Sequence, residues 1–235
     1  MNNLSNSIGL LRLMQLADSA LPIGALSHSF GLETLAAEEI LTVSRLEAFL
    51  QGYLEEAGQF EGTFCRLAYR LAGQEETFTE SWLALNQRLS AFKLAREARS
   101  ASATLGRRFV QLALSLDNAA QLRIALDICK NSDTELHHSP AFGLVGGVLG
   151  IEEEAVVLAY LHQAVTSLVS ACQRLMPLGQ SQASQILWRF KPKLYEVVHQ
   201  SLANTENPEK LQNFTPMLEL GSMRHSLLTT RLFIS

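Results

Sequence analysis

Apolar side chains recur along most of the chain at the spacing of one face of an α-helix. A clear run is Leu46, Phe49, Leu50 and Tyr53, and another occupies residues 64–71. Three- and four-residue spacing places apolar groups on one side of a helix that has 3.6 residues per turn. Segments that alternate between apolar and polar residues, as strands do, are nearly absent. The pattern therefore predicts an all-α protein.

Local signals mark where some of these helices begin and end. Ser44 followed by Glu47 fits a capping box, in which each side chain bonds a backbone amide of the first turn. Residues 152–154 are three glutamates, and carboxylates suit a helix amino terminus. We expect a helix to begin there and to end before Pro177.

The chain shows no internal division. A further helix is expected over about residues 181–204, with Pro208 after its end. Only six prolines occur, and no linker, repeat or low-complexity tract separates two halves. We therefore predict one all-α domain over residues 1–235, a single helical bundle of about eight to ten helices.

Residues 18–33 break the helical pattern near the amino terminus. Pro22 and Gly24 predict a turn between the first two helices, and Ser27 or Ser29 could cap the helix that follows. Irregular segments of helical proteins often carry function. This segment is therefore a candidate functional region.

Residues 131–150 form a second irregular segment. His137 and His138 lead into an apolar stretch that contains four glycines. Glycines in such a setting allow two backbones to approach closely. We expect either tight helix packing or a subunit contact here.

The composition indicates a protein that contacts other proteins. Hydrophobic residues make up 47% of the 235 residues and charged residues only 18%, below the usual quarter. Some apolar surface is therefore expected to meet a partner. The net charge of -4 offers no general positive field for a phosphate backbone, so nucleic-acid binding is not expected.

The sequence predicts a cytoplasmic protein without a membrane span. Cys65, Cys129 and Cys172 are far apart and form no CxxC pair, so we expect buried free thiols in a reducing compartment. No basic segment precedes the first apolar stretch, as a secretory signal would require. The uncharged run over residues 155–173 carries a polar group every three or four positions, which is typical of a buried helix with a polar stripe.

Motifs for catalysis are not found. The glycines of residues 143–150 lack the Lys and hydroxyl residue of a phosphate-binding P-loop, and HExxH and the nucleophile elbow do not occur. Ser27 and His28 are neighbours, but adjacent side chains on a helix start point apart, so we interpret them as capping and packing residues rather than a catalytic pair. No catalytic residue and no cofactor are expected.

His137 and His138 are the weak candidates for a metal site. Imidazole binds nickel and zinc well, but adjacent side chains diverge and no third ligand follows at helical spacing. We interpret the pair as solvated loop residues. Weak metal binding or a contact across a dimer axis remains the alternative.

A cluster of cations lies between residues 88 and 108. This stretch contains six Lys and Arg residues and one acidic residue, Glu97. One predicted helical segment therefore has a local charge of +5. Arg96 and Arg99 share a helix face. The cluster suits either an acidic protein surface or a solvated helix with local ion pairs.

Several of these motifs together resemble the UreF family of urease accessory proteins. Residues 13–33 match its amino-terminal signature, and shorter motifs follow in the family's order: Arg96-Glu-Ala-Arg99, Ser139-Pro140, Pro177-Leu-Gly179-Gln180 and Arg231-Leu-Phe. The resemblance spans nearly the whole chain. It departs from the family pattern at Leu26, Ser226 and Ile234.

The resemblance implies an all-α, cytoplasmic homodimer with no cofactor. It implies partners as well: the scaffold UreD (UreH), the GTPase UreG and, through their complex, apo-urease, to which nickel is delivered. The residues it places in partner contacts are Pro22, Gly24, Ser27, His28, Ser29, Gly31, Glu33, Arg96, Glu97, Arg99, Gly179, Gln180, His225, Arg231, Leu232 and Phe233.

Two functions are compatible with this resemblance. The first is a non-enzymatic adaptor that bridges the scaffold and the GTPase. The second is a regulator that acts directly on the GTPase, with Arg96 or Arg231 entering its site as arginine fingers do. A plain nickel carrier would need a ligand cluster that the sequence does not show.

Residues 222–235 form an apolar end of the chain. We expect them to leave the helical body after Pro216 and Gly221. Burying two or three of the apolar side chains would contribute ~1.5–3 kcal/mol each, so this tail should dock on the protein's own body or on a partner. The resemblance favours the UreD scaffold, with Arg231 paired to one of its carboxylates. Deleting the tail should then abolish scaffold binding and leave the helices intact.

Overall fold

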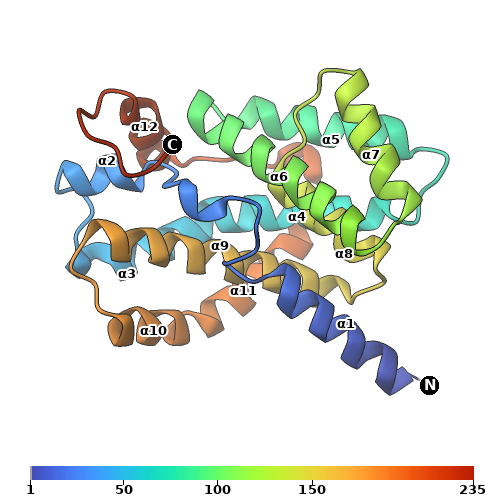
Figure 1. The fold of residues 1–235 in the computed structure, drawn as a ribbon, viewed down its shortest axis with the longest axis horizontal. Helices are drawn as coiled ribbons and strands as arrows, with labels where there is room; N and C mark the ends of the chain where they lie inside the picture. Colours follow the sequence, from blue (N-terminus) through green and yellow to red (C-terminus); the bar gives the residue numbers. More distant parts are fainter. Residues whose placement is uncertain (1) are drawn as a thin grey trace.

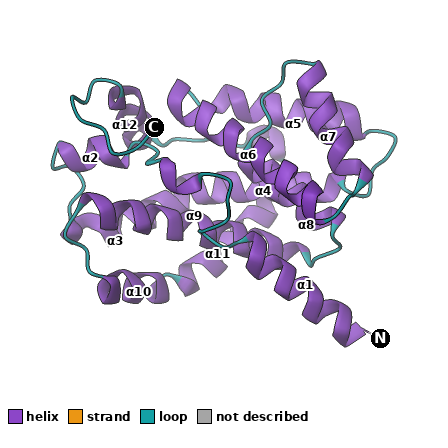
Figure 2. Ribbon diagram, in the orientation of Figure 1, coloured by secondary structure: helices purple, strands orange, loops and turns teal. Residues whose placement is uncertain are grey.

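The protein is built from helices joined by short loops. The computed structural model describes residues 2–235, and within them no strand occurs (Figure 2). This confirms the all-α prediction, and the helices α1 to α12 are close in number to the eight to ten expected. Their bounds are α1 Asn2–Leu16, α2 Leu32–Ala37, α3 Leu46–Tyr53, α4 Gln59–Leu71, α5 Phe78–Phe92, α6 Arg96–Leu116, α7 Ala120–Asn131, α8 His138–Val148, α9 Glu153–Leu175, α10 Gln180–Arg189, α11 Lys191–Asn204 and α12 Pro216–His225. Shorter helical turns are η1 Ala25–Ser27, η2 Val43–Arg45, η3 Leu54–Gly58 and η4 Pro208–Lys210.

Helix α4 lies at the centre of the molecule. It packs against α5, α8, α9 and α11, and α8 in turn packs on α6 (Figure 1). Phe109 of α6 and Phe142 of α8 are almost fully buried in the main apolar core, whereas Phe64 of α4 is buried in a smaller cluster with Phe60, Leu89 and Leu211. The three cysteines are buried and free, as predicted. Helix α1 extends away from this body at the amino-terminal end (Figure 1).

The glycines of α8 let it approach α4 at close range. A Cβ atom on Gly143 would lie 1.9 Å from the backbone oxygen of Cys65, and one on Gly147 would lie 2.6 Å from that of Tyr69. Only a residue without a side chain fits at such distances. Of the two alternatives for this segment, the structure therefore shows tight packing of two helices within the chain.

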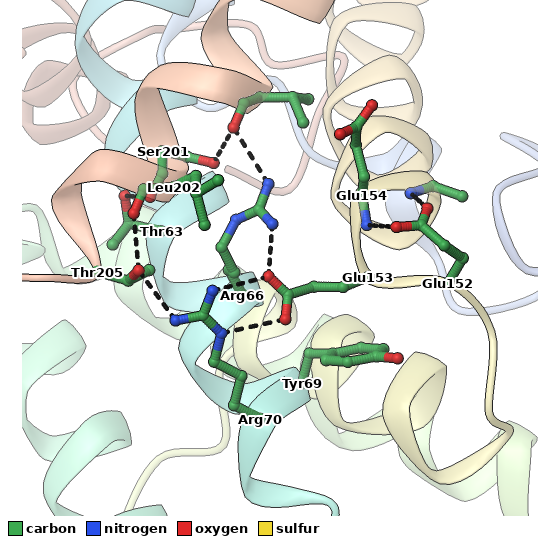
Figure 3. A network of polar contacts seen from close by, with 12 residues as sticks. Thr63, Arg66, Tyr69, Arg70, Glu152, Glu153, Glu154, Ser201, Leu202 and Thr205 are labelled. Carbon is green, nitrogen blue, oxygen red and sulfur yellow. Dashed lines mark hydrogen bonds and ion pairs between the residues drawn. The ribbon is translucent and has the colours of Figure 1, made fainter.

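A partly buried ion-pair network joins α4 to α9 and α11. Glu153 accepts from Arg66, and it binds Arg70 through two contacts, Nη2 to Oε1 at 3.0 Å and Nε to Oε2 at 3.1 Å (Figure 3). Arg66 also donates to the carbonyl oxygen of Val198, and Arg70 to the hydroxyl of Thr205. Burial acts to raise the pKa of Glu153, but the two arginines outweigh it and lower that pKa. The network fixes the amino-terminal end of α9 against the core.

Some predicted helix boundaries are confirmed. Glu152 caps α9 by accepting from the amides of Glu154 and Ala155, and the helix ends at Leu175, before Pro177. The end of α11 at Asn204 also agrees with the prediction.

Other boundaries were predicted wrongly. The capping box does not form, because Ser44 lies in η2 and its hydroxyl bonds that of Thr42. The helix expected over residues 181–204 is two helices, α10 and α11, which meet at Phe190. Pro192 lies in the first turn of α11, where a backbone amide would have no partner within the helix, so the missing N–H of proline costs no helical hydrogen bond.

Helix α9 is the candidate membrane span of the described chain by length and composition. Its 23 residues have a mean hydropathy of 1.5 over the most apolar window, and 56% of that window is buried inside the protein. A helix packed on α4, α8, α10 and α11 in this way is a core helix of the bundle.

Candidate functional site

The loop of residues 18–31, here called the first loop, is shaped by two glycines. Gly24 and Gly31 have φ angles of 87° and 89°, in the left-handed region that favours glycine. A Cβ atom on Gly31 would lie 2.8 Å from the backbone oxygen of Leu218 in α12. Helix α12 makes the matching approach, since a Cβ atom on Gly221 would lie 2.7 Å from the backbone oxygen of Gly31. Gly31 and Gly221 therefore bring the first loop into direct contact with α12.

The last residues of the chain dock on the first loop. The amide of Ser29 donates to the backbone oxygen of Ser235 at 2.5 Å, and the amide of Ile234 donates to that of Ser27 at 2.9 Å. The ring nitrogen Nδ1 of His28 lies 2.7 Å from the hydroxyl of Ser235. The tail, defined from here on as residues 226–235, thus returns to the body beside α2 and α12 (Figure 1).

Phe233 anchors this tail. Its side chain is 5% exposed and belongs to the main apolar core. The guanidinium of Arg174, in the last turn of α9, lies 4.2 Å from the centre of the Phe233 ring, within the range of a cation–π contact. Arg174 also donates to the backbone oxygen of Leu26 at 2.7 Å. One residue of α9 therefore holds both the tail and the first loop.

Glu33, at the start of α2, binds the tail backbone. Its Oε1 accepts from the amide of Leu232 at 2.5 Å, and its Oε2 accepts from the amide of Phe233 at 3.1 Å. The residue is only 6% exposed. Burial acts to raise the pKa of Glu33, but the hydrogen bonds from Leu232, His225 and Phe233 outweigh it and lower that pKa. Glu33 therefore binds the tail as a carboxylate.

His225, at the end of α12, connects three elements. Its Nε2 lies 2.9 Å from Oε2 of Glu33 in α2, and its Nδ1 lies 2.8 Å from Oε2 of Glu97 in α6. The ring is fully buried. The structure thus joins the predicted residues Glu33, Glu97 and His225 in one cluster, here called the triad.

The position of the tail differs from the prediction. The chain does not leave the helical body at residue 222, because Pro216 begins α12 and Gly221 lies inside it. Phe233 and Ser235 are buried on the protein's own body, whereas Leu232 and Ile234 are 54% and 71% exposed. The tail therefore docks on its own chain and still presents apolar side chains outward.

The two arginines of the tail region differ in their contacts. Arg224 forms an ion pair with Glu38 at 2.8 Å. Arg231 is exposed and has no hydrogen-bonding or ionic partner among residues 7–235, whose side chains the structure describes. It is available to a carboxylate of another molecule.

Arg96 and Arg99 lie on the rim of a groove beside the tail. The groove has a volume of about 600 Å³ and is bounded by α6, Glu135 and Ser235. Arg99 donates to the backbone oxygen of Lys93 and pairs with Glu135 at 3.4 Å, whereas exposed Arg96 has no such partner among the described residues. The cation cluster is not one helical segment, because α5 ends at Phe92 and α6 begins at Arg96.

Other predicted residues have different surroundings. Gln180 begins α10 and Gly179 precedes it at the cap position; the helix packs on α9 and α11 and lies apart from α12 (Figure 1). Pro22 is exposed at the turn of the first loop. No serine side chain caps α2, because Gly31 occupies the cap position and the hydroxyl of Ser29 has no hydrogen-bond partner in the structure.

The interpretation of His137 and His138 as a solvated pair is wrong. His137 is fully buried, and its two ring nitrogens lie 2.7 Å and 3.2 Å from the hydroxyls of Ser90 and Ser102. Burial, and to a smaller extent Lys93, lower the pKa of His137 to about 3. His138 packs edge-on against Phe109 and Tyr160. Within the described residues no group of three or more His, Cys, Asp or Glu side chains could hold a metal ion.

Three residues of this site were not predicted to make the contacts that the structure shows. Arg174 and Ser235 contact the first loop and tail, and Gly221 contacts Gly31. Gly221 could have been found from its place five residues after Pro216, since a small residue inside a short helix often marks a close helix contact. Nothing local distinguishes Arg174, because its partners are 148 and 59 positions away along the chain.

Family and sequence comparisons with known proteins agree with one another. The UreF family model matches residues 40–191. The chain is 32% identical over 228 residues to the urease accessory protein UreF of Geobacillus kaustophilus, which covers 96% of this chain and 98% of that protein. It is 34% identical to the UreF protein of Bacillus sp. strain TB-90 and 31% identical to that of Lachnoclostridium phytofermentans, each covering 96% of this chain and at least 98% of the relative.

Proposed function

Because the chain belongs to the UreF family of urease accessory proteins, we propose that it is a non-enzymatic adaptor in the complex that delivers nickel to apo-urease. In this role it bridges the UreD (UreH) scaffold and the GTPase UreG. Nickel is the cargo of the complex and not a resident cofactor of this chain. The protein acts as a homodimer in the cytoplasm, as the family resemblance implies.

The observation that supports the adaptor role most directly is the docked tail. Phe233 and Ser235 point into the body, and the intervening side chains of Leu232 and Ile234 stay exposed. Leu227, also on the tail, is 76% exposed. Together these side chains form an apolar surface on an already ordered backbone, which lowers the ordering cost of binding.

We assign this surface to the UreD scaffold. Arg231 lies within it without a partner of its own, and its guanidinium suits bidentate pairing with a carboxylate. The groove edge with exposed Arg96 is assigned to UreG, because an unpaired cation next to an open groove fits an acidic protein face.

A second candidate function uses the same exposed arginines. Arg96 and Arg231 are both free to enter the site of another protein, as arginine fingers do in GTPases. In that case the protein would change the chemistry of UreG and not only its position.

Binding measurements with purified partners test the adaptor role. We expect Arg231→Ala to weaken capture of UreD, and a chain ending at Ser226 to lose it, with little change in circular dichroism. Arg107→Ala is the matched control, since Arg107 is an exposed cation of α6 that does not line the groove beside the tail. Undiminished UreD capture by the truncated chain would refute the assignment.

GTP turnover separates the two functions. The adaptor hypothesis predicts that UreG hydrolyses GTP at the same rate with and without this chain. The regulator hypothesis predicts a faster or slower rate that returns to the basal value with Arg96→Ala or Arg231→Ala.

A further inference from the structure

A cavity, here called the inner cavity, lies between the first loop and the helices of the body. Residues of the first loop, α4, α6, α8, α9 and α12 line it, and its volume is about 130 Å³. An engineered apolar cavity of about 150 Å³ in another protein binds benzene. The inner cavity therefore has room for a small organic molecule.

Three polar side chains that line the inner cavity each have a buried atom without a hydrogen-bond partner among the described residues. These atoms are Oε1 of Gln163, Nε2 of His138 and Oδ1 of Asn213. Gln163 is only 2% exposed. Its Nε2 faces the carbonyl oxygens of Leu16 and Asp18 at 3.5 Å, so exchanging the two amide atoms would set oxygen against oxygen. Buried acceptors that lack a partner cost free energy, so these side chains require a hydrogen-bond donor.

The charged groups of the cavity wall are already engaged. Among the described residues that line it, Lys93 is the only Lys or Arg, and it forms an ion pair with Glu61. Glu219, in the first turn of α12, accepts from the amide of Ala95 and lies at the positive end of the helix dipole. Burial, against the opposite effect of Glu61, lowers the pKa of His138 to about 4, so its ring is neutral at ordinary pH. The wall therefore suits a neutral molecule better than an ion.

The rest of the wall is largely apolar and aromatic. Phe30, Phe60 and Tyr160 line the cavity, and planar rings pack well against such side chains. The turn η3, which contributes Ala57, has π-helical geometry. Such turns are rare and occur frequently at functional sites. An apolar pocket with a few polar groups is the usual form of a small-molecule site.

A carboxamide group matches the unpartnered atoms. Its NH2 group can donate to the oxygens of Gln163 and Asn213, and its carbonyl oxygen can accept from the ring of His138. We propose that the inner cavity is a binding site for a small neutral molecule that carries a carboxamide group on a planar apolar body. This inference goes beyond the adaptor role and does not depend on it.

Titration of the isolated full chain with benzamide tests the site. The readout is the chemical shift of the backbone amides of Ala25, Ala57 and Ala98, which line the inner cavity. We expect these signals to move with a Kd of ~0.1–10 mM, the range of a ligand of this size, and the signals of α10 to stay in place. Benzoate and benzamidinium have nearly the same shape but carry a charge, and each should bind at least about tenfold more weakly.

A substitution on α9 identifies the polar group that binds the carboxamide. Gln163→Leu keeps the size of the side chain and removes Oε1, so the Kd for benzamide should rise about fivefold or more. Gln173→Leu is the matched control, because Gln173 lies on the same helix, does not line the cavity and bonds Gln180 instead. It should bind benzamide like the parent. Circular dichroism checks that both variants are folded.

Specific results would overturn the site. These are the absence of saturable shifts at ~20 mM benzamide, twice the weakest expected Kd, and shifts centred away from the cavity-lining amides. Benzoate or benzamidinium binding as tightly as benzamide would refute the neutral carboxamide as the ligand class. A folded Gln163→Leu chain with the parent's affinity would do the same. If Gln163→Leu does not fold, the comparison of the three compounds on the parent chain still decides.

Discussion

Replacing Phe233 with alanine tests whether the tail is part of the fold. The side chain is 5% exposed, and burying a Phe contributes ~1.5–3 kcal/mol. The contact with the exposed Arg174 guanidinium adds ~0.5–1 kcal/mol. Phe233→Ala should therefore reduce the docking free energy of the tail by ~2–4 kcal/mol.

The effect on global stability has an upper limit. Once the tail has left the body, Phe233 no longer contributes, so the loss in free energy of unfolding cannot exceed the free energy of tail docking. Urea unfolding measures that loss, and exchange of the Ser29 amide, which donates to Ser235, reports undocking directly.

Ile234→Ala is the matched control for this substitution. Ile234 is the neighbouring apolar residue and is 71% exposed, so its change should alter stability by no more than ~0.5 kcal/mol. If the two variants unfold at the same urea concentration and exchange Ser29 at the same rate, Phe233 does not anchor the tail.

Two further predictions concern the core. Gly143→Ala should destabilise the protein by ~1–3 kcal/mol or more, or prevent folding, because its Cβ would meet the Cys65 backbone, whereas Gly73→Ala, with open space around it, should change little in thermal melts. Stability should fall as the pH drops from about 6.5 towards 3, because the unfolded chain protonates His137 near its ordinary value of 6.5 and the folded chain only near 3. This group alone gives a slope of ~1.4 kcal/mol per pH unit, measurable by urea unfolding at several pH values, and His137→Gln should reduce the measured slope by about that amount.

The fold was predictable where its cause is local. A repeated apolar face specifies a helix without reference to the rest of the chain, and the charges at Glu152 act on the amides directly after it. The break at Phe190 was missed because Pro192 fits the first turn of a new helix as well as the loop after an old one.

The candidate site was predictable only in part, because its contacts join distant parts of the chain. Resemblance to the family selected Glu33, Glu97 and His225, yet no local pattern indicates that residues 192 and 128 positions apart form one cluster. The burial of His137 was missed for the same reason. Adjacent histidines before a proline look solvated, and only the distant hydroxyls of Ser90 and Ser102 make a buried neutral ring acceptable.

Under the proposed function, the docked tail serves both the fold and a partner. Ordering a flexible backbone costs ~1–2 kcal/mol per residue, which a free tail would have to overcome at the moment of binding. Here the burial of Phe233 and the hydrogen bonds to Glu33 offset that cost within the folded chain. Leu232 and Ile234 can then contribute their exposed apolar surface to a partner with less loss of entropy. Changes to the inward residues should therefore weaken partner binding even though those side chains are buried within the chain.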